Sequence, residues 1–119
     1  MQTDIAARTY EEMRTKKRFD VKLKAVGKIV GDERKEHEFL LSDLSANGAR
    51  LHFETTLDVK TGMSIALIIF IPNTILTIPN TGEIKGVTRK GNVVSVGVKF
   101  QDILSEIMMN RLTGAAAAG

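Results

Sequence analysis

The sequence predicts a single, mostly β domain in which six short strands form a small antiparallel barrel and one helix follows at the C-terminal end. Three observations support this prediction. The chain has 119 residues, which is the length of one domain. Apolar and polar residues alternate with a period of two over most of it. Clusters of turn-forming residues separate the alternating segments at short intervals, which is typical of a small barrel.

The first three strands are predicted from their alternation and from the turns between them. The first is expected to cover residues 18–30, where apolar side chains occupy every second position over much of the segment. The second covers residues 36–44 and the third residues 49–54. Turn-forming residues separate these strands at 31–34 and at 43–48. We expect the three strands to follow one another as in a meander.

The second half of the barrel begins with residues 63–71, an apolar run that predicts a buried strand. Its seven-residue apolar core is much shorter than the roughly 20 residues of a membrane-spanning helix. The sequence Ile-Pro-Asn-Thr occurs at 71–74 and again at 78–81. Because proline cannot donate to a sheet ladder, we interpret the first copy as a hairpin turn and the second as a bulge. The last two strands are expected at 82–88 and 93–100.

A helix is expected after the sixth strand, with the carboxylate of Asp102 as its cap. It would cover an open end or an edge of the barrel. Met109 lies beside the predicted apolar face and is available to a partner or to a second copy of the chain. The predicted apolar face has spacings of one, three and four residues and consists of Ile103, Leu104, Ile107, Met108 and Leu112.

The chain is thus divided into three parts. Residues 1–17 are expected to form a mobile N-terminal arm, because they are polar and charged and supply few core residues. Residues 18–112 form the barrel and its helix. Residues 113–119 hold four alanines between glycines and are expected to be a disordered tail or an expression remnant.

Positive charge is concentrated near the N-terminus. The formal net charge of the chain is +3, yet six basic residues and one acid lie between Arg14 and Lys24. Such a concentration attracts anions to one place, although a merely solvated face would have the same composition.

The residues of common catalytic and metal sites are largely missing from the sequence. There is no cysteine, and His37 and His52 fall at positions that we expect to face solvent. No sequence pattern of a metal site, a nucleophile elbow or a phosphate-binding glycine loop occurs. We therefore expect no enzyme, no cofactor and no metal. Without an apolar leader segment, a cytoplasmic protein with no membrane insertion is expected.

Two short motifs carry the strongest indication of function. Arg14 and Arg18 form an RxxxR pattern, and Asp43, Ser45 and Gly48 form a DxSxxG pattern. A guanidinium group binds a phosphate or the edge of guanine through two parallel hydrogen bonds, and it stacks on purines. The Asp43 carboxylate can accept hydrogen bonds from guanine, and the Ser45 hydroxyl can donate or accept.

Gly48 completes the second motif, where we expect a positive φ and a close approach of the backbone. The same residues could instead make only an Asx-turn between two strands, in which Gly48 supplies the left-handed residue. The sequence alone leaves both interpretations open for this corner.

At these residues the chain resembles the PilZ domain family, over about residues 13–112. The resemblance includes Arg18-Phe19 at the first strand, the DxSxxG turn, and Gly-Val-Lys-Phe at 97–100 before the helix. It implies a six-stranded antiparallel split β-barrel that binds the bacterial second messenger cyclic di-GMP. The ligand residues it implies are Arg14, Arg18, Asp43, Ser45 and Gly48. A domain of this size would pass its signal to an effector protein that the sequence does not identify.

Two alternatives remain open at this stage. One is a barrel of the same family that binds a protein and no nucleotide. The other is a small basic barrel that binds nucleic acid, which needs exposed aromatic platforms. The chain has five Phe, one Tyr and no Trp, and most of the Phe fall at core-facing positions. No DNA or RNA partner is therefore expected.

Overall fold

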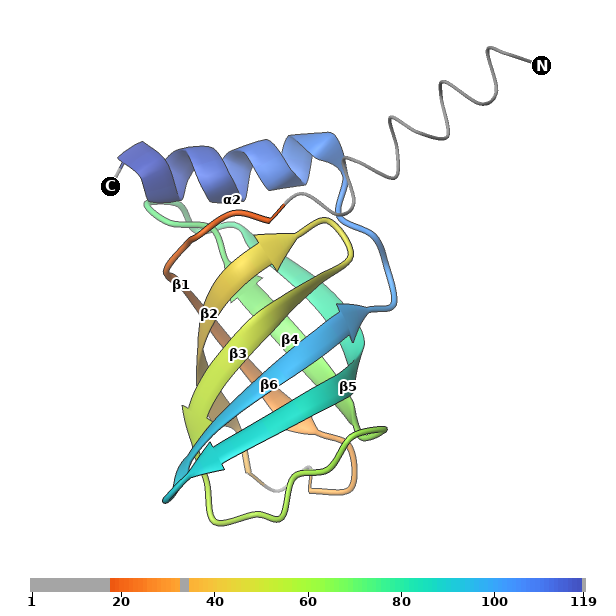
Figure 1. Cartoon of the computed structure of the whole chain (residues 1–119). Helices are drawn as coiled ribbons and strands as arrows, with labels where there is room; N and C mark the ends of the chain where they lie inside the picture. The colour runs from red at the N-terminus through yellow and green to blue at the C-terminus, as the bar shows by residue number, and fades with distance from the viewer. Residues whose placement is uncertain (1–17, 33–34, 119) are drawn as a thin grey trace, which may run out of the picture.

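A computed structural model of the chain describes residues 18–32 and 35–118, except for the side chains of 115–118. Six antiparallel strands close into a barrel in the order β1-β2-β3-β6-β5-β4. Helix α2 (Glu106–Ala118) lies across one end of this barrel (Figure 1). The strands are β1 (Leu23–Ile29), β2 (His37–Ser45), β3 (Gly48–Glu54), β4 (Ser64–Phe70), β5 (Thr77–Lys90) and β6 (Val93–Phe100).

The strand order corrects the expected meander. The next strand in the chain, β4, does not pair with β3. Instead β3 pairs with β6, and β4 pairs with β1. Residues 55–63 make this connection across the end of the barrel that lies opposite α2 (Figure 1). Arg89 stabilises the connection, since its guanidinium donates to the carbonyl oxygens of Thr55, at 2.9 Å, and Leu57.

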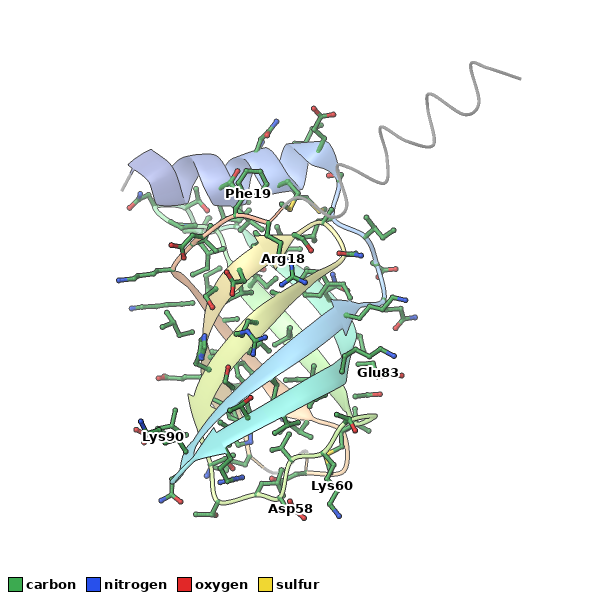
Figure 2. The ribbon with its side chains drawn as sticks, in the orientation of Figure 1. Arg18, Phe19, Asp58, Lys60, Glu83 and Lys90 are labelled. Carbon is green, nitrogen blue, oxygen red and sulfur yellow. The ribbon has the colours of Figure 1, made fainter. Side chains whose placement is uncertain are left out.

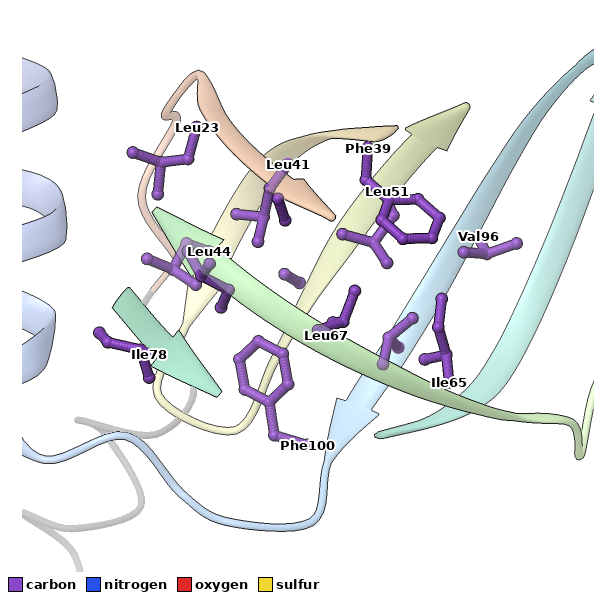
Figure 3. Packing of buried hydrophobic residues seen from close by; sticks show 14 of the residues in the cluster. Leu23, Phe39, Leu41, Leu44, Leu51, Ile65, Leu67, Ile78, Val96 and Phe100 are labelled. Atoms are coloured by element: carbon purple, nitrogen blue, oxygen red, sulfur yellow. The ribbon is translucent and has the colours of Figure 1, made fainter. Parts of the chain in front are cut away.

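The alternation seen in the sequence becomes the inside and the outside of the barrel. In β4, for example, Ile65, Leu67 and Ile69 are fully buried while the residues between them face outward. Figure 3 shows how inward side chains from different strands meet in one core. Because the barrel has one inside and one outside, all six strands use their period-two pattern in the same way.

The second Ile-Pro-Asn-Thr segment is not the bulge that we expected. It lies within β5, where Pro79 pairs in register with Ile68 of β4. The ladder to β6 begins only at Gly82, so β5 has a side without a strand neighbour at Pro79, and proline is tolerated there. The irregularity of β5 lies further along, between Ile84 and Gly86.

Helix α2 begins later than predicted. The Ser105 hydroxyl, rather than the Asp102 carboxylate, accepts a hydrogen bond from the first turn, from the amide of Met108 at 3.2 Å. Asp102 is held before the helix instead, because the Asn80 side chain donates to its carbonyl oxygen at 2.9 Å. The helix then continues to Ala118, past the boundary at residue 113 where the tail was expected to begin.

The later start also changes which side of α2 packs on the barrel. Met109 and Leu112 are buried, together with Leu104 before the helix. Ile103, Ile107 and Met108, which were expected in the packed face, are exposed. The prediction for Met109 is therefore wrong: this side chain covers the barrel and is not available to a partner.

The structure also corrects the position of His37. This side chain is buried beside the rings of Phe39 and Phe53, with ring centroids 6.0 and 5.3 Å away. Burial lowers the pKa of His37, and nearby Lys35 lowers it further. His52 does lie on the outer wall, where its Nε2 is 2.9 Å from the Ser42 hydroxyl.

Candidate ligand-binding site

Four of the five predicted site residues line one open cleft of about 240 Å³. These are Arg18, Asp43, Ser45 and Gly48, and Arg14 lies outside the described residues. The cleft lies near the end of the barrel that α2 covers, where Figure 2 shows Arg18 and Phe19. The two motifs therefore meet in space although 25 residues separate Arg18 from Asp43 in the chain.

A single β-bridge places Arg18 at the cleft. Regular β1 starts only at Leu23, but Phe19 forms two backbone hydrogen bonds with Leu44 of β2, at 2.8 and 2.9 Å. The Phe19 ring packs against the core. Because the bridge is antiparallel, it places Arg18 opposite Ser45, and Arg18, Asp43 and Ser45 line the same cleft.

Asp43 lies at an irregularity of β2 and has a positive φ of 47°. Aspartate tolerates this left-handed conformation better than most residues because its short polar side chain bonds locally. The conformation leaves the Asp43 side chain about half exposed, 3.9 Å from the guanidinium of Arg50. So long and exposed an ion pair contributes little stability. The carboxylate therefore stays available for other partners.

Ser45 belongs to the tight turn between β2 and β3. Its buried hydroxyl lies 2.8 Å from Asn47 Oδ1 and 3.3 Å from the Gly48 carbonyl oxygen, which it can reach as a donor. The turn itself is fixed from outside, because Phe100 and Leu104 donate backbone hydrogen bonds to Asn47 and Ala46. A local turn is therefore present, but its left-handed residue is Asp43 and not Gly48 as expected. With its one proton used there, the Ser45 hydroxyl can serve any further group only as an acceptor.

Gly48 shows one of the two expected properties. Gly48 has no positive φ, and the residue with a positive φ in this turn is Asp43. The close approach is present: a Cβ at Gly48 would lie 2.3 Å from the carbonyl oxygen of Val98 in β6. Glycine is therefore required because the backbones of β3 and β6 are packed together beside the cleft.

The cleft also holds residues that the motifs do not include. Of these, the sequence could have indicated Arg50, because alternation from Gly48 puts it on the same face of β3. Asn47 and Ala49 flank Gly48 in the chain, and the remaining residues come from β5 and β6 and can be found only once the strand order is known. The further lining residues are Asn47, Ala49, Arg50, Lys85, Gly97, Val98 and Lys99.

At Gly97 the floor of the cleft on β6 carries no side chain, while Val98 and Lys99 of the same strand line the cleft beside it. Gly97 pairs in register with Arg50 on one side and with Gly86 of β5 on the other. Neither Gly97 nor Gly86 has a positive φ, and a Cβ on either would touch nothing within 4 Å. The fold does not require glycine at these two positions, and Gly97, the one of the two that lines the cleft, leaves bare backbone beside Arg50.

The lining of the cleft is cationic. It includes four basic side chains, Arg18, Arg50, Lys85 and Lys99, and one carboxylate, Asp43. Glu83 forms an ion pair with Lys85, and the hydrogen bond from Lys85 lowers the pKa of Glu83. Even so, the excess of positive charge suits an anionic ligand.

A small β-barrel with a cationic cleft at its rim and a covering helix defines a binding module. The family model of the PilZ domain matches residues 12–115. The chain therefore belongs to the PilZ domain family, whose members are receptor modules rather than enzymes. The resemblance drawn from the two motifs and from the Gly-Val-Lys-Phe strand end is confirmed.

Solved structures with the same fold include two from bacteria. The Bacillus subtilis inhibitor of motility MotI (DgrA) is 17% identical with a TM-score of 0.63, over 85% of this chain and 48% of that chain. The PilZ domain of Escherichia coli YcgR with c-di-GMP is 16% identical with a TM-score of 0.59, over 87% and 89% of the two chains. The chain thus spans about half of MotI. No curated protein matched the sequence.

Two other kinds of feature are absent from the described part of the chain. No group of three or more His, Asp or Glu side chains is arranged to hold a metal ion. No helix there is both long and apolar enough to cross a membrane.

Proposed function

We propose that this domain is a receptor for cyclic di-GMP, with Arg18, Asp43, Ser45 and Gly48 in its binding site. The observation that carries the proposal is the meeting of Arg18 with the Asp43–Gly48 corner in one cationic cleft. Membership of the PilZ family supports it, as does the cyclic di-GMP in the structure of the YcgR domain.

Each residue has a distinct task in the proposed complex. Arg18 binds a phosphate or the O6 and N7 edge of guanine through two parallel hydrogen bonds. Asp43 accepts hydrogen bonds from guanine N1–H and N2–H, a donor pair that adenine lacks. Ser45 accepts from the ligand, and Gly48 keeps the corner close to β6. Binding is the whole activity of the domain, which has no catalytic role.

Titration calorimetry with cyclic di-GMP tests this assignment. Arg18→Ala removes a charge-assisted hydrogen-bonding group, so we expect a loss of about 1.5–3 kcal/mol, or about ten- to a hundredfold in affinity. Arg111→Ala is the matched control, because Arg111 is an exposed arginine on α2 away from the cleft. Cyclic di-AMP should bind more weakly than cyclic di-GMP. Equal affinities for the parent and Arg18→Ala would refute the role of Arg18.

We further propose that ligand binding passes a signal to an effector protein through the segment that contains Arg14. The two arginines of RxxxR would then hold one ligand from both sides, which ties residues before Arg18 to the rim of the barrel. Such a change of surface is a common form of switch. Hydrogen exchange on residues 8–18 should show increased protection with saturating cyclic di-GMP. Unchanged protection, with binding confirmed by calorimetry, would reject the switch and leave the receptor assignment intact.

A further inference from the structure

Arg50 lines the ligand cleft together with Arg18, although the two sequence motifs do not include it. It lies near the middle of β3, and alternation places its side chain on the outside of the barrel. The residues that pair with it in register have little or no side chain, since they are Ser42 of β2 and Gly97 of β6. The long Arg50 side chain therefore has room to take more than one position across the cleft.

Two weak contacts hold the Arg50 guanidinium in this structure. Its Nε is 3.9 Å from the Asp43 carboxylate oxygen Oδ2, and its Nη1 donates to the Ser95 hydroxyl at 3.3 Å. Both side chains of the ion pair are close to half exposed, at 42% for Arg50 and 48% for Asp43. An ion pair so long and exposed is easily broken, and the hydrogen bond to Ser95 is longer than usual. A ligand that offers better partners can therefore displace Arg50 at small cost.

The Asp43 carboxylate meets in Arg50 the same kind of donor group that it would meet in guanine. A guanidinium presents parallel N–H donors in one plane, and the N1–H and N2–H of guanine form a similar planar pair. A guanine that binds Asp43 therefore takes this carboxylate away from Arg50. The released guanidinium then lies in a cationic cleft beside a ligand with two phosphates. A phosphate is a partner that its planar donors fit well.

We propose that Arg50 is a further ligand-binding residue, which exchanges Asp43 for a phosphate of cyclic di-GMP when a guanine binds Asp43. This inference rests on the proposed function of the cleft. It couples recognition of the base to recognition of the phosphate, because Arg50 is released only when a guanine satisfies the carboxylate. A nucleotide without the guanine donor pair, such as cyclic di-AMP, leaves Arg50 with Asp43 and gains less from it.

A double-mutant cycle measured by titration calorimetry with cyclic di-GMP tests the exchange. Arg50→Ala should weaken binding about tenfold, because a charge-assisted hydrogen-bonding group is lost. In the Asp43→Asn background Arg50 has no carboxylate to leave, so Arg50→Ala should weaken binding by the same factor or more. Arg50→Lys keeps the charge without the paired planar donors, and its affinity should lie between those of the parent and Arg50→Ala. Lys90→Ala, at an exposed position of β5 outside the cleft lining, is the control and should bind like the parent.

The cycle separates this role from two simpler ones. If Arg50 only positions Asp43, Arg50→Ala should weaken binding in the parent and have no effect beside Asp43→Asn. If Arg50 only competes for Asp43, Arg50→Ala should tighten binding in the parent. Either result would overturn the proposal, while binding of cyclic di-GMP by the parent would keep the receptor assignment. A parent that does not bind cyclic di-GMP would overturn both.

Nuclear magnetic resonance of the arginine side chains gives a second test. The Nε–H signal of Arg50 is identified as the one that Arg50→Lys removes, and the Nε–H signal of Arg111 on α2 serves as the reference. Saturating cyclic di-GMP should shift the Arg50 signal and slow its exchange with water, because a phosphate then holds the guanidinium. The Arg111 signal should stay where it is. An Arg50 signal that does not change, in a sample whose backbone shifts show that the ligand is bound, would overturn the exchange.

Discussion

Two glycines of the cleft differ in what they do, although both lie on neighbouring strands. Gly48 is required by the fold, because a Cβ there would meet a backbone oxygen of Val98 at 2.3 Å. Gly97 is not required by the fold, because a Cβ there would point into open space. Its absent side chain leaves room that we assign to the ligand. The two positions can therefore separate stability from binding.

Substitution of these glycines should have opposite effects. Gly48→Ala forces apart the backbones of β3 and β6 and should lower the free energy of unfolding by about 1–3 kcal/mol. Gly97→Val should change it by no more than about 0.5 kcal/mol, since valine suits a strand. The affinity for cyclic di-GMP should be highest for the parent, lower for Gly97→Ala and lowest for Gly97→Val, because a larger side chain fills more of the floor. Urea denaturation and calorimetry measure the two effects. A Gly97→Val variant that binds like the parent would show that the ligand does not use this floor.

His37 is a residue whose burial makes stability depend on pH. Its Nε2 has no hydrogen-bond partner among the described residues, and its pKa is lowered chiefly by burial. In the unfolded chain the pKa of histidine is about 6.5. The unfolded state therefore takes up a proton before the folded state does as the pH falls. Titration of His37 therefore leaves the free energy of unfolding unchanged above about pH 6.5. Below that pH it lowers the free energy of unfolding, until the pH reaches the pKa of His37 in the folded state.

Replacement of His37 should remove this dependence. A single titrating group can change the free energy of unfolding by at most about 1.4 kcal/mol per pH unit. His37→Phe keeps an aromatic ring beside Phe53 and cannot titrate, so its urea midpoint should fall less than that of the parent between pH 7.5 and 5. His52→Gln is the control on the partly buried histidine of the outer wall and should behave like the parent. Identical pH profiles for the parent and His37→Phe would contradict the assignment.

At the scale of single elements, helix α2 shows how a local cap decides a packed face. The apolar residues from 103 to 112 allow more than one face, and the start of the helix selects between them. Because Asn80 holds Asp102 in the preceding segment, the helix starts after Ser105 and turns Met109 and Leu112 toward the barrel. The sequence predicts the helix itself, but the Asn80 contact spans 22 residues and cannot be inferred from local pattern.

Truncation on the two sides of α2 should confirm this orientation. Met109→Ala removes a buried side chain and should cost about 2 kcal/mol of unfolding free energy. Ile107→Ala shortens an exposed side chain and should change stability by less than about 0.5 kcal/mol. Chemical denaturation measures both. A larger loss for Ile107→Ala than for Met109→Ala would mean that the helix packs in the orientation first expected from the sequence.

The strands were more predictable than the helix, for a physical reason. Burial on one side of a sheet repeats at every second residue, so positions such as Leu51, Ile65 and Val96 are recognised locally as core. Element ends depend on neighbours instead. β5 extends back through Pro79 because β4 continues beside it, and β1 begins late because the preceding residues form only the Phe19–Leu44 bridge.

For the whole molecule, closure in the order β3-β6-β5 builds the candidate site. The two motifs are visible in the sequence because each is short and contiguous, and Arg50 follows by alternation. Lys85, Gly97 and Lys99 come to the cleft only through pairing between strands that are far apart in the chain. Pairing of this kind was not predicted, because an expected meander would have placed β4 beside β3.

The central claim is that cyclic di-GMP binds where Arg18 meets the Asp43–Gly48 corner. A titration of isotope-labelled protein with cyclic di-GMP, followed by amide chemical shifts, tests it most directly. We expect saturable shifts concentrated at Arg18, at residues 43–50 and at 97–99, with the outer wall of β1 and β4 unaffected. No shifts at millimolar ligand, or shifts confined to a surface away from this cleft, would contradict it.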